Sequence, residues 1–271
     1  MKIGKNIAPS SGISTANPET IVVRGQDLCQ DLIGQVNFGD YFYFLLTGKK
    51  ADAKMSALLN ACMVAIGEHG MVPSVQAARM TLAAAPDAMQ GAVAAGILGC
   101  GSVILGASET AGRLFLQIEK EAANHGGDIN AAAHKLVSAL RANRQSVPGY
   151  GHPLHKDLDP RVKALYELAK KVNADQRYVD ISIAVENAIP GIVGKALKLN
   201  VSAAIPAVLL GCGFPVNALK GVPMLARTAS LIAHMSEELE NPIGFALSNE
   251  AVSNQQYTGA LPAGFDTRHQ A

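Results

Sequence analysis

Apolar side chains recur at helical spacing along most of the chain. The clearest stripe covers residues 55–66, where hydrophobic positions return every three or four residues. A second stripe covers residues 162–172 and follows Asp159-Pro160, a pair typical of a helix start because proline fits the first turn. These patterns predict two amphipathic helices.

Two further ranges, 127–145 and 176–189, have the same helical character, and Pro190 is expected to end the second. The strand-like stretch Thr20–Arg24 is short and is followed by Gly25, as in one half of a hairpin. Helices therefore dominate the prediction, and the expected fold class is all-α.

Three breaks interrupt the helical pattern, and each contains polar or glycine residues of interest. We predict loops at Gly99–Gly106, Ser146–Pro160 and Lys198–Val201. The chain shows neither an internal repeat nor a low-complexity linker.

Composition supports a packed, folded protein. Apolar residues make up 49% of the 271 residues and charged residues 17%, while aromatic residues reach only 5%. Much of the apolar content is alanine, which favours closely packed helices.

Charge and cysteine usage exclude several partners. The net charge is +1 without a basic stripe, so we expect no nucleic-acid partner. We find no signal peptide and no uninterrupted apolar stretch near 20 residues, and we expect no membrane association. The cysteines are widely spaced, which favours reduced thiols in a cytoplasmic protein and offers no metal site. They are Cys29, Cys62, Cys100 and Cys212.

The first candidate motif is Glu68–Ser74, where one helix is expected to end in glycine and another to begin. His69 at this junction either projects into a ligand cleft or is a satisfied capping residue. Spacing by itself leaves both interpretations open.

The second motif is Val147–Lys156, followed by Asp159-Pro160-Arg161. Its glycines permit close approach of a ligand to the backbone, and His, Lys and Arg lie within ten residues of one another. This composition suits an anionic, carbonyl-bearing ligand, although an ordinary polar loop remains an alternative. His152 and His155 lack a nearby carboxylate or cysteine to complete a metal site, so no metal is expected.

The third motif, Gly99–Glu109, is rich in small residues and resembles a phosphate-binding loop only weakly. It has neither a preceding strand nor a Lys-Ser/Thr ending. Close packing of helices through small residues explains it better.

Taken in order, five segments resemble the successive signatures of citrate synthases, and more closely those of citryl-CoA lyases and the lyase domain of ATP-citrate lyase. They read HGMVPSVQAAR, GSVILGASE, VPGYGHPLHKDLDPR, LNVSAAIPAVLLGCGFP and ARTASLIAH. The opening IVVRGQDLCQDLIGQVNFGDYFYFLLTG is similar to the N-terminal segment of the same family. The resemblance covers nearly the whole chain.

This resemblance implies a citrate synthase-like, two-domain helical fold with the active site between the domains. The large domain is expected to comprise residues 1–108 and 222–271, and the small domain residues 109–221. It also implies a homodimer or higher homo-oligomer that binds an acyl-CoA and a carboxylated small molecule. Coenzyme A thioester would be a substrate, and no metal would be needed.

Matching the motifs position by position assigns roles to individual residues. His69 would contact the carboxylate or carbonyl of a 2-oxo acid, and His152 would handle the proton of the hydroxyl or carbonyl oxygen. Arg161 and Arg227 would clamp carboxylates. The backbone of Val147, Pro148 and Gly149 would line the adenine site of CoA, and Tyr150 and Gly151 would complete this CoA-binding segment.

Two positions depart from the family pattern. Family members usually have HGGA where this chain has Ile104-Leu105-Gly106-Ala107, so the substrate-facing histidine that hydrogen-bonds the thioester enolate is replaced by Ile104. They also have NVD where this chain has Asn200-Val201-Ser202, so Ser202 stands in the catalytic position of the carboxylate that moves the α-proton. The lyase domain of ATP-citrate lyase also lacks that histidine, which makes Ser202 the graver departure.

Three functions follow from these departures. The chain remains a carbon–carbon lyase or synthase, with water, Glu109 or His155 replacing the missing carboxylate. Alternatively, it performs a related reaction, such as thioester hydrolysis or cleavage of a different 3-hydroxyacyl-CoA. In the third case it is a catalytically silent binder of acyl-CoA or polycarboxylate. The tail SNQQYTG replaces an Arg-bearing segment of citrate synthases, which hints at a smaller or less charged acid than citrate.

Overall fold

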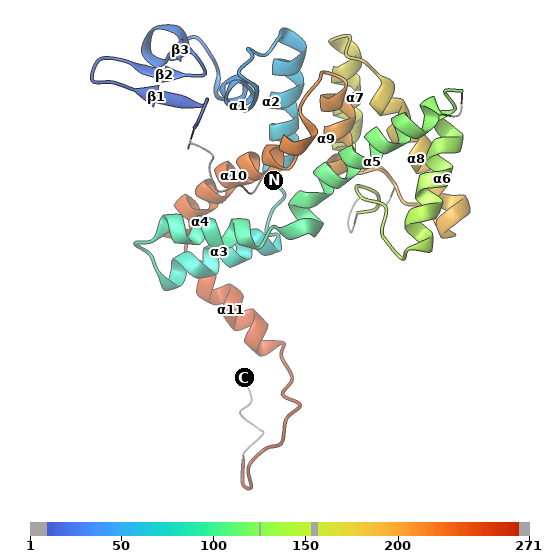
Figure 1. The fold of residues 1–271 in the computed structure, drawn as a ribbon. Coiled ribbons are helices and arrows are strands. Elements are labelled where there is room, and N and C mark those ends of the chain that lie inside the picture. Colours follow the sequence, from blue (N-terminus) through green and yellow to red (C-terminus); the bar gives the residue numbers. More distant parts are fainter. Residues whose placement is uncertain (1–9, 125, 153–156, 266–271) are drawn as a thin grey trace, which may run out of the picture. The chain divides into compact units, whose positions relative to one another are not determined.

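The structure is a computed structural model that describes residues 10–124, 126–152 and 157–265, apart from the side chains of residues 102 and 103. Within these residues the chain is predominantly helical, which confirms the predicted all-α class (Figure 1). The longer helices are α1 (Phe38–Thr47), α2 (Ala53–Gly67), α3 (Pro73–Ala84), α4 (Met89–Leu98), α5 (Gly106–Ala123), α6 (Ile129–Ala142), α7 (Pro160–Lys171), α8 (Arg177–Val193), α9 (Val201–Leu210), α10 (Gly221–Glu240) and α11 (Gly244–Ser253). Short helical turns lie at η1 (Leu28–Leu32), η2 (Gly101–Leu105) and η3 (Val216–Ala218).

A small antiparallel sheet precedes the helices in the order β1 (Ser14–Ala16), β2 (Ile21–Val23) and β3 (Gln26–Asp27). The predicted strand is confirmed as β2. Arg24 and Gly25 have φ angles of 50° and 82°, as the tight turn between β2 and β3 requires. The sheet therefore extends the predicted half-hairpin by two strands.

The four helices predicted from periodicity are all present as α2, α7, α6 and α8. Asp159 caps α7 by accepting a hydrogen bond from the Arg161 N–H, and Pro160 occupies the first turn, as its fixed φ angle allows. The predicted end of α8 at Pro190 is wrong. Pro190 lies in the last turn, where it removes a single hydrogen bond, and the helix continues to Val193 before Gly194 caps it with φ of 80°.

The predicted loop at Gly99–Gly106 is also different in the structure. Residues 101–105 form the wide helical turn η2, which leads directly into α5. The Gly106 N–H donates to the Gly101 carbonyl, so this turn keeps backbone hydrogen bonding through a stretch that small residues suggested was irregular.

The chain divides into two compact units. Unit 1 comprises Met1–Ala65 and Ser108–Val222, and unit 2 comprises Ile66–Ala107 and Pro223–Ala271. The contacts group residues 1–65 with residues 108–222, whereas the prediction placed residues 1–65 in the large domain with residues 222–271. Each unit has its own packed helices.

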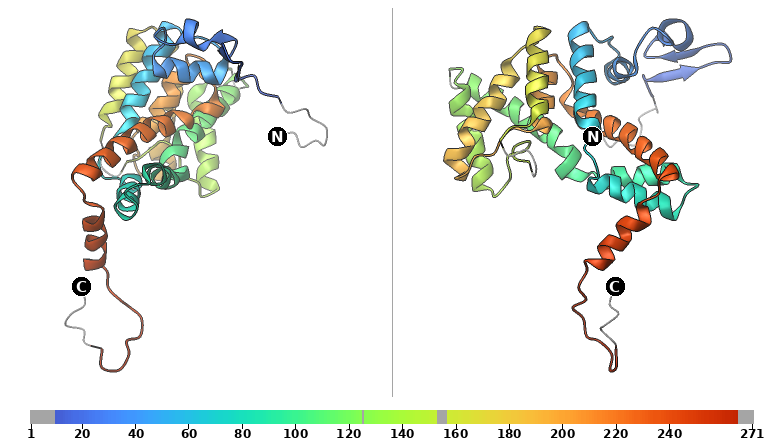
Figure 2. Two further views of the ribbon diagram at one scale, coloured as in Figure 1. Left: turned by 90° about the vertical axis from the view of Figure 1, so that its left-hand side faces the viewer. Right: turned by 180° about the vertical axis from the view of Figure 1, so that it is seen from behind.

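In unit 1, α9 is the most deeply buried helix, with all its residues from Ala203 to Leu209 buried. Helix α8 packs against α6 and α9, and α7 packs against α9. Helices α6 and α8 lie side by side in Figure 1 and in the right-hand view of Figure 2. A smaller cluster of Val23, Leu32 and Phe44 joins the sheet to η1 and α1. The rigid packing around α9 matters because its N-terminus carries Ser202.

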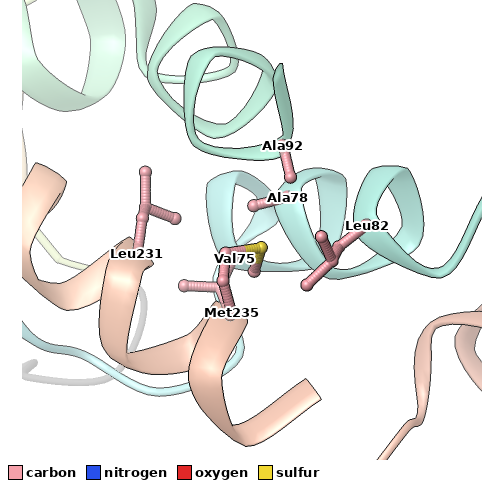
Figure 3. Packing of buried hydrophobic residues seen from close by; sticks show 6 residues of the cluster. All are labelled: Val75, Ala78, Leu82, Ala92, Leu231 and Met235. Atoms are coloured by element: carbon pink, nitrogen blue, oxygen red, sulfur yellow. The ribbon is translucent and has the colours of Figure 1, made fainter. Parts of the chain in front are cut away.

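Unit 2 is built on three helices that share one apolar cluster. Its buried members come from α3, α4 and α10, as Figure 3 shows, and are Val75, Ala78, Leu82, Ala92, Leu231 and Met235. Gly96 permits this close packing, because a Cβ there would lie 2.8 Å from Leu231 and 2.9 Å from the Ser74 carbonyl. The expected close packing through small residues is therefore found one turn before the predicted motif.

Among the described residues, no helix combines the length and the apolar character that a bilayer crossing needs.

Candidate functional site

The glycine-rich loop of unit 1 is joined to the start of α9 by backbone hydrogen bonds. Tyr150 and Leu199 form an isolated antiparallel bridge. The Gly151 N–H donates to the Lys198 carbonyl over 2.7 Å, and the Asn200 N–H donates to the Gly149 carbonyl over 3.0 Å. These bonds fix the predicted CoA-binding segment, Val147–Gly151, beside Ser202, and we call this segment the ledge.

Position 149 requires a glycine in this arrangement. Its φ angle is 84°, and a Cβ there would lie 2.5 Å from the Cβ of Ala203 and 2.9 Å from its nitrogen. The sequence predicts that glycine here permits close approach of a ligand, and in the structure Gly149 permits close approach of the loop to α9.

The side chain of Asn200 hydrogen-bonds both the loop and the start of α9. Its Oδ1 accepts a hydrogen bond from the Ser202 N–H over 2.9 Å, which caps α9, and its Nδ2 donates to the Gly151 carbonyl over 2.7 Å. Sequence reasoning missed this residue, although an Asn immediately before an apolar run is a recognised helix-capping signal.

Arg161 forms a forked ion pair with buried Asp159. Its Nε and Nη2 lie 2.9 and 2.8 Å from the two carboxylate oxygens, and Asp159 also accepts the Val201 N–H over 3.0 Å. Burial by itself raises the pKa of Asp159, but the hydrogen bonds and charge of Arg161, together with the Val201 N–H, lower it below its usual value. Arg161 thus keeps only Nη1 and the outer face of its guanidinium for a substrate carboxylate.

Ser202 lies in the first turn of α9 and is partly buried. The N–H groups of this turn are already engaged: Val201 donates to Asp159, Ser202 to the Asn200 side chain, and Ala203 to the Asn200 carbonyl. The helix terminus therefore offers no unused backbone donor to an enolate oxygen, and the Ser202 hydroxyl is the polar group that remains there.

Glu109 and His155 are the side chains proposed to replace the missing carboxylate. Glu109 is paired with Arg113 along α5, with 2.6 Å between Oε1 and Nη2. His155 lies outside the described residues, as do Pro153, Leu154 and Lys156 of the same motif. Asp159 does reach the start of α9, but both its oxygens are already bound.

Two residues of α8, Ser182 and Glu186, hydrogen-bond the ledge and the segment paired with it. The Tyr150 hydroxyl donates to the Ser182 carbonyl over 2.7 Å, and Glu186 accepts the Leu199 N–H over 2.7 Å. Burial raises the pKa of the Tyr150 hydroxyl well above its ordinary value, so this hydroxyl stays protonated and remains a donor. His152 directly follows Gly151 and is half-buried. Val147 is buried and Pro148 half-buried in the same loop.

In unit 2, His69 lies in the turn between α2 and α3, and the adjacent Glu68 organises that turn. Glu68 Oε1 accepts the N–H of His69 over 2.9 Å and the N–H of Gly70. Its other oxygen accepts the hydroxyl of Ser230 and lies 3.1 Å from His234 Nε2. Sequence reasoning did not single out Glu68.

Arg227 is on the helix that Glu68 contacts. Arg227, Ser230 and His234 are spaced three and four residues apart on α10 and so lie along one face. Arg227 is 4% exposed, and the Ala226 carbonyl lies 3.8 Å from the position of a Cβ on Gly67, one residue before Glu68. Unit 2 therefore brings the His69 turn alongside the part of α10 that carries Arg227.

Ile104 is half-buried in η2 of unit 2, and its aliphatic side chain has no donor. His234 is 14% exposed, and its two ring nitrogens face Glu68 and Arg79. Both ring nitrogens of His234 therefore lie within reach of a charged partner.

Unit 1 contains two cavities that are lined by residues other than the predicted site residues. One of about 520 Å³ is lined by residues of η1 and α1, and one of about 430 Å³ lies beside Asp52, Lys54 and Cys212. Neither contains a predicted site residue, so the candidate site rests on the contacts of its side chains. Over the part of the chain that the structure describes, no three His, Cys, Asp or Glu side chains gather as metal ligands.

Comparisons with known proteins bear on both fold and family. A citryl-CoA lyase from Hydrogenobacter thermophilus is 30% identical with a TM-score of 0.80, and the match covers 95% of this chain and 97% of that one. An ATP citrate lyase from Methanosaeta concilii, in complex with (3S)-citryl-CoA, has the same fold, with a TM-score of 0.76 at 20% identity over 97% of this chain and 43% of that one.

Among sequence relatives, the citrate synthase of Synechocystis sp. is 27% identical over 211 residues, which is 76% of this chain and 50% of that protein. The chain spans 50% of the length of this relative and 37% of the length of a glyoxysomal citrate synthase from Cucurbita maxima. The family model described as the citrate synthase C-terminal domain matches residues 10–244. The predicted family is thereby confirmed, and the chain belongs to the citrate synthase family.

Proposed function

We propose that this protein makes or breaks a carbon–carbon bond between an acyl-CoA thioester and a 2-oxo acid, as a citryl-CoA lyase does. The observation that carries the proposal is the similarity to a citryl-CoA lyase over nearly the full length of both chains. The proposed substrates are a coenzyme A thioester and a carboxylated small molecule, and no metal takes part.

The proposed roles follow the contacts within each unit. The ledge of Val147–Gly151 binds CoA, and its hydrogen bonds with Lys198 and Asn200 fix its backbone for that role. Arg161 offers its outer face to a carboxylate, and Arg227 and His69 bind carboxylate or carbonyl groups.

In the cleavage direction, His152 takes the hydroxyl proton of the 3-hydroxyacyl thioester. The carbon–carbon bond then breaks, leaving the carbonyl of the 2-oxo acid and the enolate of the acyl-CoA. A proton must finally reach the enolate carbon. Ile104 offers no hydrogen bond to the enolate, and Ser202 is too weakly acidic to supply that proton. Since Glu109 is paired with Arg113, the proposed donor is water or His155, which lies outside the described residues.

The reaction should therefore be slow. A missing positioned acid or base costs about 10²–10⁴ in rate, and a missing enolate donor roughly 10²–10³. These losses need not multiply, because such groups act as a unit.

The direct test incubates the pure protein with citryl-CoA, or with acetyl-CoA and oxaloacetate, and follows the thioester and free thiol. We expect slow, saturable turnover that Glu109→Ala leaves unchanged and His152→Ala removes. Release of thiol without any 2-oxo acid would instead identify thioester hydrolysis.

A double substitution tests the two departures. Ile104→His with Ser202→Asp should raise citryl-CoA cleavage by about 10²-fold or more, because it restores one enolate donor and one acid. An unchanged rate, in a variant that unfolds at the wild-type temperature, would contradict the placement of these positions in the site.

A silent binder of acyl-CoA or polycarboxylate is the second candidate. It is favoured by the state of two acids of unit 1, since Asp159, which contacts the start of α9, and Glu109 on α5 are both paired with arginines. Calorimetry that finds CoA binding, together with turnover no faster than that of His152→Ala, would support this candidate over the first.

The assembly, domain division and location stay proposals. We propose a homodimer or higher homo-oligomer in the cytoplasm, with domains of 1–108 plus 222–271 and of 109–221. Large apolar side chains are exposed on α10 and α11 of unit 2, as a surface buried by a second copy would be. They are Ile232, Leu239, Phe245 and Val252. Sedimentation of the pure protein as a monomer at micromolar concentration would refute the dimer.

A further inference from the structure

We propose that Glu68 is a positioning residue that fixes the His69 turn to helix α10, and through it to Arg227. No role for this carboxylate follows from the predicted site, whose members in unit 2 are His69, Ile104 and Arg227. The inference rests on the proposed function only for its effect on catalysis, since the contacts themselves are independent of any substrate.

One carboxylate gathers four donors from two segments. Oε1 of Glu68 accepts the backbone N–H groups of His69 and Gly70, so it grips the turn by its main chain. Oε2 accepts the hydroxyl of Ser230 and faces His234 Nε2. Because the two oxygens belong to one planar group, the turn and α10 cannot shift independently while both sets of bonds hold.

The α10 end of this link is itself anchored. His234 Nδ1 faces Arg79 at 3.4 Å and Glu237 at 3.9 Å. Arg79 is 2% exposed, and its Nε lies 2.7 Å from buried Glu238. Glu68 therefore ties the turn to the firmly packed contact of α3 and α10, not to a mobile surface group.

Glu68 is ionised under ordinary conditions. Burial by itself raises its pKa, but hydrogen bonds from Ser230 and the Gly70 N–H, together with His234, lower it below its ordinary value. The groups that face His234 are Glu68 on one side and Arg79 with Glu237 on the other. A carboxylate that accepts four donors needs its charge, so a neutral replacement can reproduce only part of the link.

The expected consequence is catalytic more than structural. The Glu68 side chain is 51% exposed, so its loss leaves the apolar cluster of unit 2 intact. A misplacement of about 1 Å at a reacting group costs on the order of 10²-fold in rate. Removal of Glu68 should therefore impair the use of the carboxylated substrate while the fold persists.

The first measurement needs no activity. Amide hydrogen exchange at His69 and Gly70 is compared in the wild-type protein, Glu68→Ala, Glu68→Gln and Glu237→Ala. Glu237 is the matched control, because it is a carboxylate on α10 that faces His234 without contacting the turn. Exchange at both amides should rise about tenfold in Glu68→Ala, less in Glu68→Gln, which keeps one acceptor oxygen, and not at all in Glu237→Ala. Equal exchange in all four proteins would overturn the proposal.

The second measurement separates positioning from general damage. With citryl-CoA or oxaloacetate as the varied substrate, Glu68→Ala should lower kcat/KM about 10- to 100-fold, with partial recovery in Glu68→Gln. The Kd for CoA should be unchanged in calorimetry, because the proposed CoA ledge lies in unit 1. Faster exchange at the turn with unaltered kcat/KM would refute the catalytic part of the proposal. If the wild-type protein shows no turnover, the proposed function fails, and the exchange experiment still decides the positioning role.

Discussion

The site residues of unit 1 and those of unit 2 are held in place by different means. In unit 1, the ledge of Val147–Gly151 is fixed to α9 chiefly by main-chain hydrogen bonds and by a glycine that nothing larger can replace. In unit 2, the His69 turn depends on side chains, with Glu68 as the acceptor and Ser230 and His234 as its partners.

This difference predicts different sensitivities. Carbonyl acceptors do not titrate, so the hydrogen bonds that Gly151 and Asn200 donate to carbonyls should persist over a wide pH range. Carboxylate acceptors lose their charge in acid, so the His69 turn should loosen as pH falls. Mild acid should therefore affect the His69 turn of unit 2 more than the carbonyl-accepted hydrogen bonds of the ledge in unit 1.

The largest expected effect is on the buried end of the unit 2 network. Glu238→Ala leaves the Arg79 guanidinium without its buried partner and should lower the free energy of unfolding by about 3–5 kcal/mol. Urea unfolding measures this change. Glu237→Ala is the control, since Glu237 also pairs with Arg79 but its side chain is 57% exposed, and it should cost no more than about 1 kcal/mol. Equal losses would show that burial does not decide the strength of this network.

A somewhat smaller effect is expected at the ledge of unit 1. Gly149→Ala should cost about 2–4 kcal/mol, because it combines an unfavourable φ angle with a clash against Ala203. Gly151→Ala has the same φ of 84° but meets only Leu197, at an ordinary 3.5 Å, and should cost about 1–2 kcal/mol. The two variants separate strain from close approach in urea unfolding. Equal costs would mean that the loop can move away from α9.

Acid should act on the two regions unequally. Glu68 and Glu238 have pKa values below their ordinary 4.5, so their stabilisation is complete above that pH and is lost as pH falls through the lowered values. For Glu238, burial by itself raises the pKa, but the Gly244 N–H, Arg79 and the Ile243 N–H lower it.

Hydrogen exchange measured from pH 6 downwards, corrected for its intrinsic pH dependence, tests this comparison. The His69 and Gly70 amides, which donate to Glu68, should lose protection before the Gly151 and Asn200 amides, which donate to carbonyls. Simultaneous loss at all four amides would indicate global unfolding and remove the distinction.

The smallest effect concerns the cap of α9. Asn200→Ala should cost about 1 kcal/mol, as the loss of a helix cap does, and should also weaken CoA binding because the Gly151 carbonyl loses its donor. Asn37→Ala removes the equivalent cap from α1 and should cost a similar amount without affecting the Kd for CoA. Calorimetric titration with CoA distinguishes the two. A similar Kd in both variants would show that the cap serves stability alone.

Much of the fold could be predicted because it follows from local patterns. Residues 55–66 and 162–172 form helices as their spacing predicts, and Asp159-Pro160 starts α7 for local reasons. Pro190 shows the limit of such rules. A proline in the last turn gives up a single hydrogen bond, which packing of α8 against α6 and α9 outweighs.

By itself, the sequence determined the helical class, the family and the residue types available for chemistry, because periodicity and ordered motifs are properties of neighbouring positions. Only the tertiary structure decided which of these groups are already engaged in hydrogen bonds or ion pairs within the protein. Arg161 is half-occupied by Asp159, the first turn of α9 has its N–H groups engaged, and Glu68 joins segments 162 residues apart. Hydrogen bonds of this kind depend on distances between parts of the chain that spacing along the sequence does not encode.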